Sequence, residues 1–308
     1  MFRPKRREVL TALALAPLAA TLPACVRAQA PAAGASSLVT RPIRGVEVPV
    51  IGIGTARSYS DPAADAMATL RDTIARFAEL GGEVIDTAPS YGRAEEVVGA
   101  LVEELGVRDR LYFATKVGAN DLETGKAQIE DSFRKLRTDT IELIAVHNLR
   151  DWENHLPYLR DLRAEGRIGA VGITTSFEGQ YEAFERVLAS EELDAIQVDY
   201  ALDNRNAAER ILPLAQERGI PAMINLPFGR GRLFSATEGV PLPGWAAEIG
   251  AESWAQVFLK YIAGHPSRPI PIPGTARVAY AEDNVGAARP PLPDEDLRRR
   301  MEAFIDGL

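Results

Sequence analysis

A repeating alternation of short apolar runs and longer segments of helical period is the feature that most constrains how this chain can fold. The short runs are rich in Val and Ile and predict strands, and most neighbours begin about 25–30 residues apart, the length of one strand–helix step. Only the interval before the last run is roughly twice as long. The eight runs are 50–53, 83–86, 111–115, 141–146, 170–173, 195–198, 221–224 and 270–272.

The segments between these runs carry apolar residues at helical spacing, and eight strand–helix steps over about 260 residues predict an α/β fold of the (β/α)8 barrel type. Two apolar stretches that flank Arg44-Gly45 predict a β-hairpin closing the bottom of the barrel. The alternative is an open doubly wound sheet, but Gly52-Ile53-Gly54-Thr55 lacks the third Gly of a nucleotide fingerprint. The predicted helices are 65–80, 94–105, 129–136, 156–164, 180–188, 207–217, 253–262 and an extra C-terminal helix, 294–305.

The first 30 residues predict a signal peptide that lies outside the fold. Arg6-Arg7 precedes an apolar stretch, Val9–Leu22, and Ala28-Gln29-Ala30 has the small-residue pattern of a cleavage site. The Arg pair resembles a twin-arginine signal, whereas an ordinary secretory signal, a retained anchor or lipid attachment at Cys25 are the alternatives. We therefore expect a signal peptide at 1–30, a linker at 31–37, a barrel at 38–308, transient contact with the twin-arginine export machinery and a periplasmic location.

Composition excludes several classes of protein. Three His and one Cys are too few for a zinc cluster or a disulfide framework, so we expect no metal site. A formal net charge of -8 argues against binding to nucleic acid, which requires clustered Lys and Arg.

Three successive predicted strands end in an ionisable residue: Asp86, Lys116 and His147, and Tyr91 follows Asp86 by five positions. The C-terminal ends of barrel strands meet at one rim, so these side chains should converge. A Tyr hydroxyl, with a pKa near ~10, needs a neighbouring Lys to stabilise its phenolate, and a carboxylate beside the Lys keeps it charged. A His can orient a carbonyl oxygen. The four residues therefore predict reduction of a carbonyl group with Tyr91 as the proton donor.

The segments that carry these residues, Ile85–Gly92, Ala114-Thr115-Lys116 and Val146-His147-Asn148, resemble the signature of the aldo/keto reductase family. The resemblance extends over nearly the whole chain after the leader, through 163–173, 197–200, 227–231, 270–275 and 282–284. It implies a monomeric enzyme that reduces an aldehyde or ketone reversibly with NADPH, NADH remaining possible. Two alternatives stay open: a nicotinamide-binding regulator without catalysis, and a periplasmic binding protein for sugars or carboxylates, against which the single eight-step rhythm argues.

The resemblance also implies a cofactor site, from which this chain departs at two places. The family usually holds the nicotinamide with a Ser-Asn pair and a Gln, and stacks an aromatic ring on it. Gln197 matches, but Thr174-Thr175 and Asn225 stand at the other positions. Arg277 favours NADPH, and Trp245 is the tryptophan most suspected of contacting substrate. The implied cofactor contacts are Gly54, Thr55, Thr174, Thr175, Gln197, Asn225, Pro227, Gly229, Arg230, Gly274, Thr275, Arg277, Asp283 and Asn284.

Overall fold

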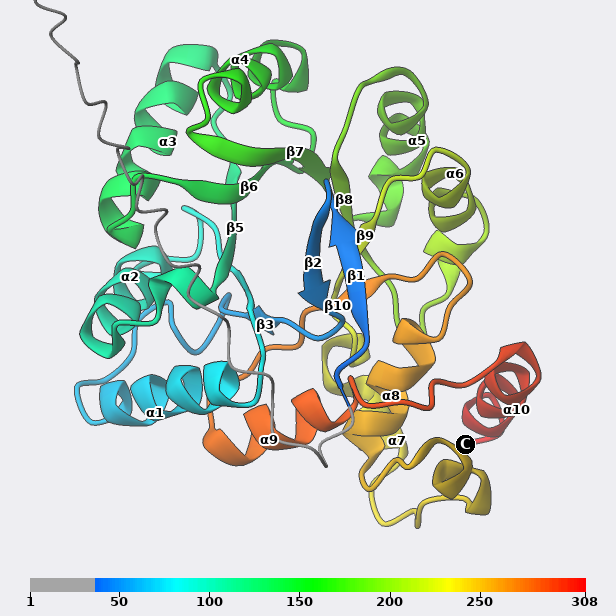
Figure 1. Cartoon of the computed structure of the whole chain (residues 1–308). Coiled ribbons are helices and arrows are strands. Elements are labelled where there is room, and N and C mark those ends of the chain that lie inside the picture. Colours follow the sequence, from blue (N-terminus) through cyan, green and yellow to red (C-terminus); the bar gives the residue numbers. More distant parts are fainter. Residues whose placement is uncertain (1–36) are drawn as a thin grey trace, which may run out of the picture. The chain divides into compact units, whose positions relative to one another are not determined.

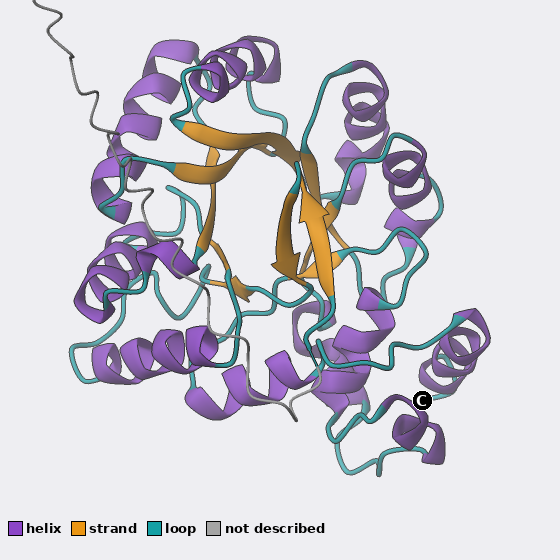
Figure 2. Cartoon of the chain, viewed as in Figure 1, coloured by secondary structure: helices purple, strands orange, loops and turns teal. Residues whose placement is uncertain are grey.

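Eight parallel strands form the centre of the fold and helices surround them (Figures 1 and 2), in a computed structural model that describes residues 37–308. The predicted signal peptide and all but the last residue of the linker, 1–36, lie outside the described residues. Each strand pairs with its neighbour in the chain, which confirms the predicted architecture. The strands are β3 (Ile53–Gly54), β4 (Val84–Asp86), β5 (Tyr112–Val117), β6 (Ile141–His147), β7 (Ile168–Thr174), β8 (Ala195–Asp199), β9 (Ala222–Asn225) and β10 (Ile270–Pro271).

The first and last strands join, which closes the sheet into a barrel. The Gly52 amide donates to the Pro271 carbonyl over 3.1 Å, and the Gly54 amide donates to the Pro273 carbonyl over 2.9 Å. A parallel bridge between Gly54 and Gly274 continues this contact. A Cβ at Gly54 would lie 2.9 Å from the Ile272 carbonyl oxygen, so the close approach requires glycine there.

The predicted hairpin covers one end of the barrel. Strands β1 (Thr40–Ile43) and β2 (Val46–Pro49) are antiparallel and turn through Arg44 and Gly45, both at positive φ. Ile43 and Val48 pack against strand residues inside the barrel, among them Val84 and Leu143. We call this end, where the strands begin, the floor, and the end where the strands finish, the mouth; Figure 1 shows the hairpin across the ring of strands.

The outer helices largely follow the predicted pattern, and their apolar faces fill the layer around the strands. Two were not predicted, α7 and α9; together with the 3-10 helix at 244–249 and α8, α7 fills the long interval before β10. The helices are α1 (Ala66–Glu79), α2 (Ala94–Leu105), α3 (Leu122–Leu136), α4 (Trp152–Ala164), α5 (Tyr181–Ser190), α6 (Ile211–Glu217), α7 (Arg232–Ala236), α8 (Trp254–Ala263), α9 (Val278–Gly286) and α10 (Glu295–Ile305).

Two helices begin earlier than their apolar patterns indicated. Helix α3 starts at Leu122 because the Asp121 carboxylate accepts a hydrogen bond from the Thr124 amide over 2.9 Å, a capping contact that the apolar spacing does not reveal. Helix α4 starts at Trp152 and contains Pro157, which is exposed. Within residues 37–308, no helix combines the length and apolarity needed to cross a membrane.

Candidate active site

A buried ion pair stands at the mouth of the barrel. Lys116, on β5, donates to both carboxylate oxygens of Asp86, on the neighbouring β4, over 2.8 and 2.9 Å. Its third donor reaches the Thr87 carbonyl over 2.7 Å. The side chains of Lys116 and Asp86 are 1% and 4% exposed, so each charge depends on the other for compensation.

Tyr91 and His147 border this ion pair. The Lys116 ammonium lies 5.2 Å from the centroid of the Tyr91 ring, and the rings of Tyr91 and His147 meet edge to face at 6.1 Å. The Ser90 hydroxyl lies 3.5 Å from His147 Nδ1. The structure therefore brings together the four side chains singled out in the sequence, from the ends of three neighbouring strands and one loop.

The electrostatics of the site follow from burial and from the ion pair. Burial disfavours the charge on Lys116, but Asp86 and Tyr91 more than offset it, so the pKa of Lys116 lies above its ordinary value. Lys116 lowers the pKa of the Tyr91 hydroxyl, whereas burial and Asp86 raise it, and the net direction is upward. Tyr91 is therefore protonated at neutral pH.

His147 is neutral. Burial, together with the positive charges of Lys116 and Arg150, lowers the pKa of His147 to about 3. A neutral imidazole has one N–H donor and one acceptor nitrogen. When Nδ1 accepts from Ser90, the N–H stands on Nε2, so His147 can donate a hydrogen bond to a substrate oxygen.

A second group of polar side chains crosses the mouth beside the ion pair. Gln197 Nε2 donates to Asn225 Oδ1 over 2.7 Å, and Asn225 Nδ2 lies 3.5 Å from Thr174 Oγ1. Burial raises the pKa of the Asp86 carboxyl, and the neighbouring Lys116 and Gln197 oppose this rise. The sequence identified each of these residues, but it did not show that they are neighbours. Their proximity depends on the strand register, which places Thr174 beside Gln197 and ends β9 at Asn225.

Two of the threonines expected to contact the cofactor use their hydroxyls in hydrogen bonds to the protein itself. Thr175 Oγ1 donates to Gln180 Oε1 over 2.6 Å and accepts from the Phe177 amide over 3.1 Å. Thr55 Oγ1 donates to the Asp86 carbonyl over 2.9 Å. These two threonines hold the loops that surround the site.

At the β10 side of the mouth, Arg277 immediately precedes helix α9, and its guanidinium lies 5.5 Å from the centroid of the exposed Tyr280 ring. Asp283 accepts from Ser253 and Gln256. Asn284 donates to the Thr275 hydroxyl over 2.9 Å. A cation beside a helix N-terminus is suited to a phosphate group, so Arg277 fits the phosphate end of a dinucleotide better than Asp283 or Asn284 does.

The loop after β9 is shaped by a close approach. Gly229 has φ 57°, and a Cβ there would overlap the Asp203 carboxylate. Asp203 in turn pairs with Arg232 over 2.8 Å, and this fixes the segment that carries Pro227 and Arg230 at the mouth. Gly274 lies opposite Gly54 at the barrel closure. Neutral hydrogen-bonding groups near the ion pair and cations farther along the mouth together fit the charge distribution of a nicotinamide dinucleotide.

Trp245, the tryptophan suspected of contacting substrate, lies against the C-terminal helix α10. Trp245 is 8% exposed and packs edge to face on Phe304 of α10, with 5.9 Å between centroids, so its environment is that of a packing residue. Among residues 37–308, no group of three or more His, Cys, Asp and Glu is arranged to hold a metal ion.

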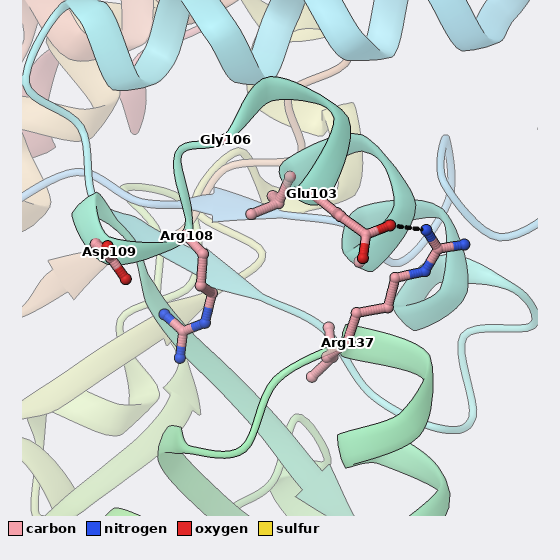
Figure 3. A pocket seen from close by; sticks show the side chains of 8 residues that line it. Glu103, Gly106, Arg108, Asp109 and Arg137 are labelled. Atoms are coloured by element: carbon pink, nitrogen blue, oxygen red, sulfur yellow. Dashed lines mark hydrogen bonds and ion pairs between the residues drawn. The ribbon is translucent and has the colours of Figure 1, made fainter.

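A hollow of about 270 Å³ lies at the floor, far from these residues along the strands, between the C-terminal ends of α2 and α3 (Figure 3). Arg137 closes one side of it through an ion pair with Glu103. Arg108, on the other side, donates to the Leu111 carbonyl and to Glu142. Both arginines that line the hollow are thus engaged by carboxylates, and none of the four side chains at the mouth reaches it, so it is not a candidate active site.

Comparison with known proteins agrees with the fold. The family model described as "Aldo/keto reductase family" matches residues 50–304. Aldo-keto reductase YhdN of Bacillus subtilis is 32% identical over 61% of this chain and 61% of its own length, so the match spans less than two thirds of that relative. The probable aldo-keto reductase 1 of Glycine max is 25% identical over 86% of this chain and 88% of its own.

Solved structures extend the likeness to the whole barrel. An aldo-keto reductase from Klebsiella pneumoniae, crystallised with NADPH, superposes with a TM-score of 0.72 at 25% identity and covers 88% of this chain and 95% of its own. A second structure from that organism, in complex with NADP and acetate, gives a TM-score of 0.70 at 25% identity, over 85% of this chain and 93% of its own. With a family model that matches most of its length, this chain belongs to the aldo/keto reductase family.

Proposed function

We propose that this protein is an NADPH-preferring oxidoreductase that reduces an aldehyde or ketone to the alcohol, reversibly, with Tyr91 as the proton donor. The observation that carries the proposal is the buried Lys116–Asp86 pair next to Tyr91 and His147 at the mouth. Burying two charges is costly, and strongly shifted pKa values in one cluster are typical of catalytic sites. The NADP(H) complexes of the Klebsiella relatives support the cofactor assignment.

Each residue has a distinct part in this mechanism. The nicotinamide, when bound, supplies a hydride to the carbonyl carbon. The Tyr91 hydroxyl, protonated at neutral pH, gives its proton to the carbonyl oxygen, and Lys116 stabilises the phenolate left behind. Asp86 keeps Lys116 charged, and the neutral His147 orients the carbonyl oxygen through its N–H. All four groups come from one chain, so a monomer suffices.

The proposed preference for NADPH rests on Arg277. Its guanidinium stands beside the N-terminus of α9 and takes part in no ion pair within residues 37–308. The 2′-phosphate that distinguishes NADPH from NADH would be bound by this cation and by the free amides of the helix end. NADH lacks that phosphate and gains nothing from either.

The test is a panel of carbonyl compounds with the purified full chain, followed by loss of absorbance from the reduced cofactor. We expect turnover, and faster turnover with NADPH than with NADH. Mass spectrometry of cofactor released from native protein gives an independent identification of the nucleotide. Tight nucleotide binding without turnover of any carbonyl would instead favour the non-catalytic regulator.

We also propose that the protein is exported folded to the periplasm. The support is the Arg6-Arg7 pair before the uncharged stretch Val9–Leu22, together with a catalytic site that needs a cytoplasmic cofactor. Replacing both arginines by lysine keeps the positive charge of the leader. We expect this variant to leave active enzyme in the cytoplasm, whereas undiminished export would exclude the twin-arginine route.

A further inference from the structure

The loops at the mouth carry arginines that no carboxylate neutralises. Within residues 37–308, Arg57, Arg150, Arg230 and Arg277 form no ion pair, although Arg232 in the same region pairs with Asp203. The chain as a whole has a formal net charge of -8, so these cations oppose its overall charge. Arg230 and Arg277 belong to the proposed cofactor side. Arg150, in the loop after β6, lies beside His147.

The position of Arg150 is defined by contacts around the catalytic histidine. Its NH1 donates to the Gly118 carbonyl over 3.0 Å, and its amide donates to the His147 carbonyl over 3.3 Å. Gly118 itself packs on the histidine, since a Cβ there would lie 3.3 Å from His147 Cβ and 3.6 Å from Nδ1. The guanidinium is thus tied to the backbone that touches the imidazole, and its charge helps to lower the pKa of His147.

The backbone around Arg150 adopts a conformation that non-glycine residues rarely have. Asn148, Leu149 and Asp151 have φ of 55°, 56° and 46°. Neighbouring loops hold the turn in place: the Asn148 amide donates to the Thr174 carbonyl over 2.7 Å, and Gln180 donates to the Asn148 carbonyl over 3.2 Å. Such conformations persist where surrounding contacts enforce them, and they are concentrated at binding and catalytic sites.

We propose that Arg150 binds an anionic group of the carbonyl substrate, a carboxylate or a phosphate, and so makes the enzyme prefer anionic carbonyl compounds. The inference rests on the proposed reductase function. With NH1 held by Gly118, the Nε and NH2 groups of Arg150 make no hydrogen bond to the described residues and are free to receive an oxyanion. The carbonyl oxygen then lies near His147 and Tyr91, and the anion lies on the β6 side of the mouth.

The experiment compares matched substrates with the full chain and NADPH. Succinic semialdehyde is paired with butanal, and glyceraldehyde 3-phosphate with glyceraldehyde, so that the two pairs separate a carboxylate from a phosphate. We expect kcat/KM for one anionic member to exceed that of its neutral partner by about 10-fold or more, as for a charge-assisted contact. Raising the salt from about 0.01 to about 1 M, which shortens the screening length from about 30 to about 3 Å, should reduce this ratio.

Two variants assign the preference to one residue. Arg150→Met should bring the anionic-to-neutral ratio close to one, and Arg150→Lys should retain part of it. Arg268 is another exposed arginine, at the floor, that forms no ion pair with the described residues. Arg268→Met should therefore leave the wild-type ratio. A ratio that Arg150→Met does not change overturns the inference, while reduction of the neutral aldehydes in that case still supports the proposed function.

A binding measurement covers the case in which no aldehyde is turned over. Calorimetry of the protein saturated with NADP+, which fills the phosphate site at Arg277, should show binding of succinate or of inorganic phosphate to the wild type, weakened about 10-fold or more in Arg150→Met and unchanged in Arg268→Met. Equal binding to all three proteins, or none to the wild type, overturns the inference. Absence of turnover with intact anion binding would count against the reductase function alone.

Discussion

Two lysines are buried at opposite ends of this barrel, and their surroundings differ. Lys116, at the mouth, is held by the Asp86 carboxylate, and its pKa lies above the ordinary value. Lys260, in α8 near the floor, is 1% exposed, and among residues 37–308 it donates only to the carbonyls of Arg289 and Pro291. Burial lowers the pKa of Lys260 to about 8. One lysine is thus kept charged, and the other is close to losing its proton.

The difference indicates what each end of the barrel does. At the floor, Ile43 and Val48 of the hairpin fill the barrel with apolar side chains, and a buried cation serves only to bind carbonyls that would otherwise lack donors. At the mouth, the charges of Lys116 and Asp86 and the phenol of Tyr91 are buried together, although apolar side chains could be buried there at a lower cost in free energy. Stability alone explains the first arrangement, whereas the second is the arrangement expected of the proposed catalytic site.

Lys116→Met should have the largest effect. It leaves Asp86 buried without its partner, which typically costs about 3–5 kcal/mol of unfolding free energy. Because the pKa of Lys116 is raised by folding, its stabilising contribution is present below pH 10.5, its ordinary value, and is lost only as the pH rises through the folded value. Urea unfolding at neutral pH measures the loss. A stability equal to that of the wild type would show that the pair contributes little.

The same variant tests the link to Tyr91. Without the ammonium, the pKa of the Tyr91 hydroxyl should rise further, and any residual oxidation of alcohol should have its optimum at higher pH. An unchanged pH profile in an active variant would mean that Lys116 does not tune Tyr91.

Tyr91→Phe should lower kcat by about 10²–10⁴-fold, the usual contribution of general acid catalysis, because the ring remains and only the proton donor is lost. Fluorescence titration should show nearly unchanged affinity for NADPH. The matched control is Tyr112→Phe, which removes a hydroxyl inside the barrel at the floor, 3.5 Å from the Glu142 carbonyl, and should leave kcat close to that of the wild type. Comparable losses in both variants would mean that the hydroxyls act through packing alone.

Arg277→Ala should weaken NADPH binding by about 10-fold or more and leave NADH binding nearly unchanged, because only the 2′-phosphate distinguishes the two cofactors. Arg289→Ala, an exposed arginine near the floor, is the control and should alter neither affinity. Equilibrium titration of both nucleotides gives the comparison. If Arg277→Ala weakens the binding of NADPH and NADH equally, Arg277 does not bind the 2′-phosphate.

The sequence predicted the fold well because the barrel repeats one local pattern. Each apolar run marks a strand, and the carboxyl ends of parallel strands must share one rim, so Asp86, Lys116 and His147 could be placed together before any contact was known. The hairpin was predictable for a similarly local reason, the Arg44-Gly45 pair between two apolar stretches, and in the structure both residues have the positive φ of a tight turn. Helix α9 was not, because it has only nine residues and its apolar pattern is short.

The residues that contact the cofactor were harder to predict, because a polar side chain can bind a ligand only if its atoms are not already hydrogen-bonded within the protein. Thr175 has the residue type of a ligand, yet its hydroxyl is engaged by Gln180 and by the Phe177 amide. Asp283 is likewise engaged by Ser253 and Gln256, far away in sequence. The role proposed for Arg150 depends on the turn after His147 and on the Gly118 carbonyl, neither of which leaves a pattern in the sequence.

Lys260→Met should give the smallest effect at neutral pH, and its diagnostic feature is a slope of stability with pH above that. In the folded protein Lys260 releases its proton near pH 8, and in the unfolded chain near 10.5, so between these values the unfolded state binds more protons. The stability of the wild type relative to Lys260→Met should therefore increase across this interval, by at most about 1.4 kcal/mol per pH unit. Titrations of all other groups are common to both proteins and cancel in the difference. Urea unfolding of the two proteins at several pH values between 7 and 10.5 measures the slope. If the difference in unfolding free energy stays constant with pH, or decreases as expected for a lysine whose pKa is raised by folding, the two lysines do not have opposite pKa shifts.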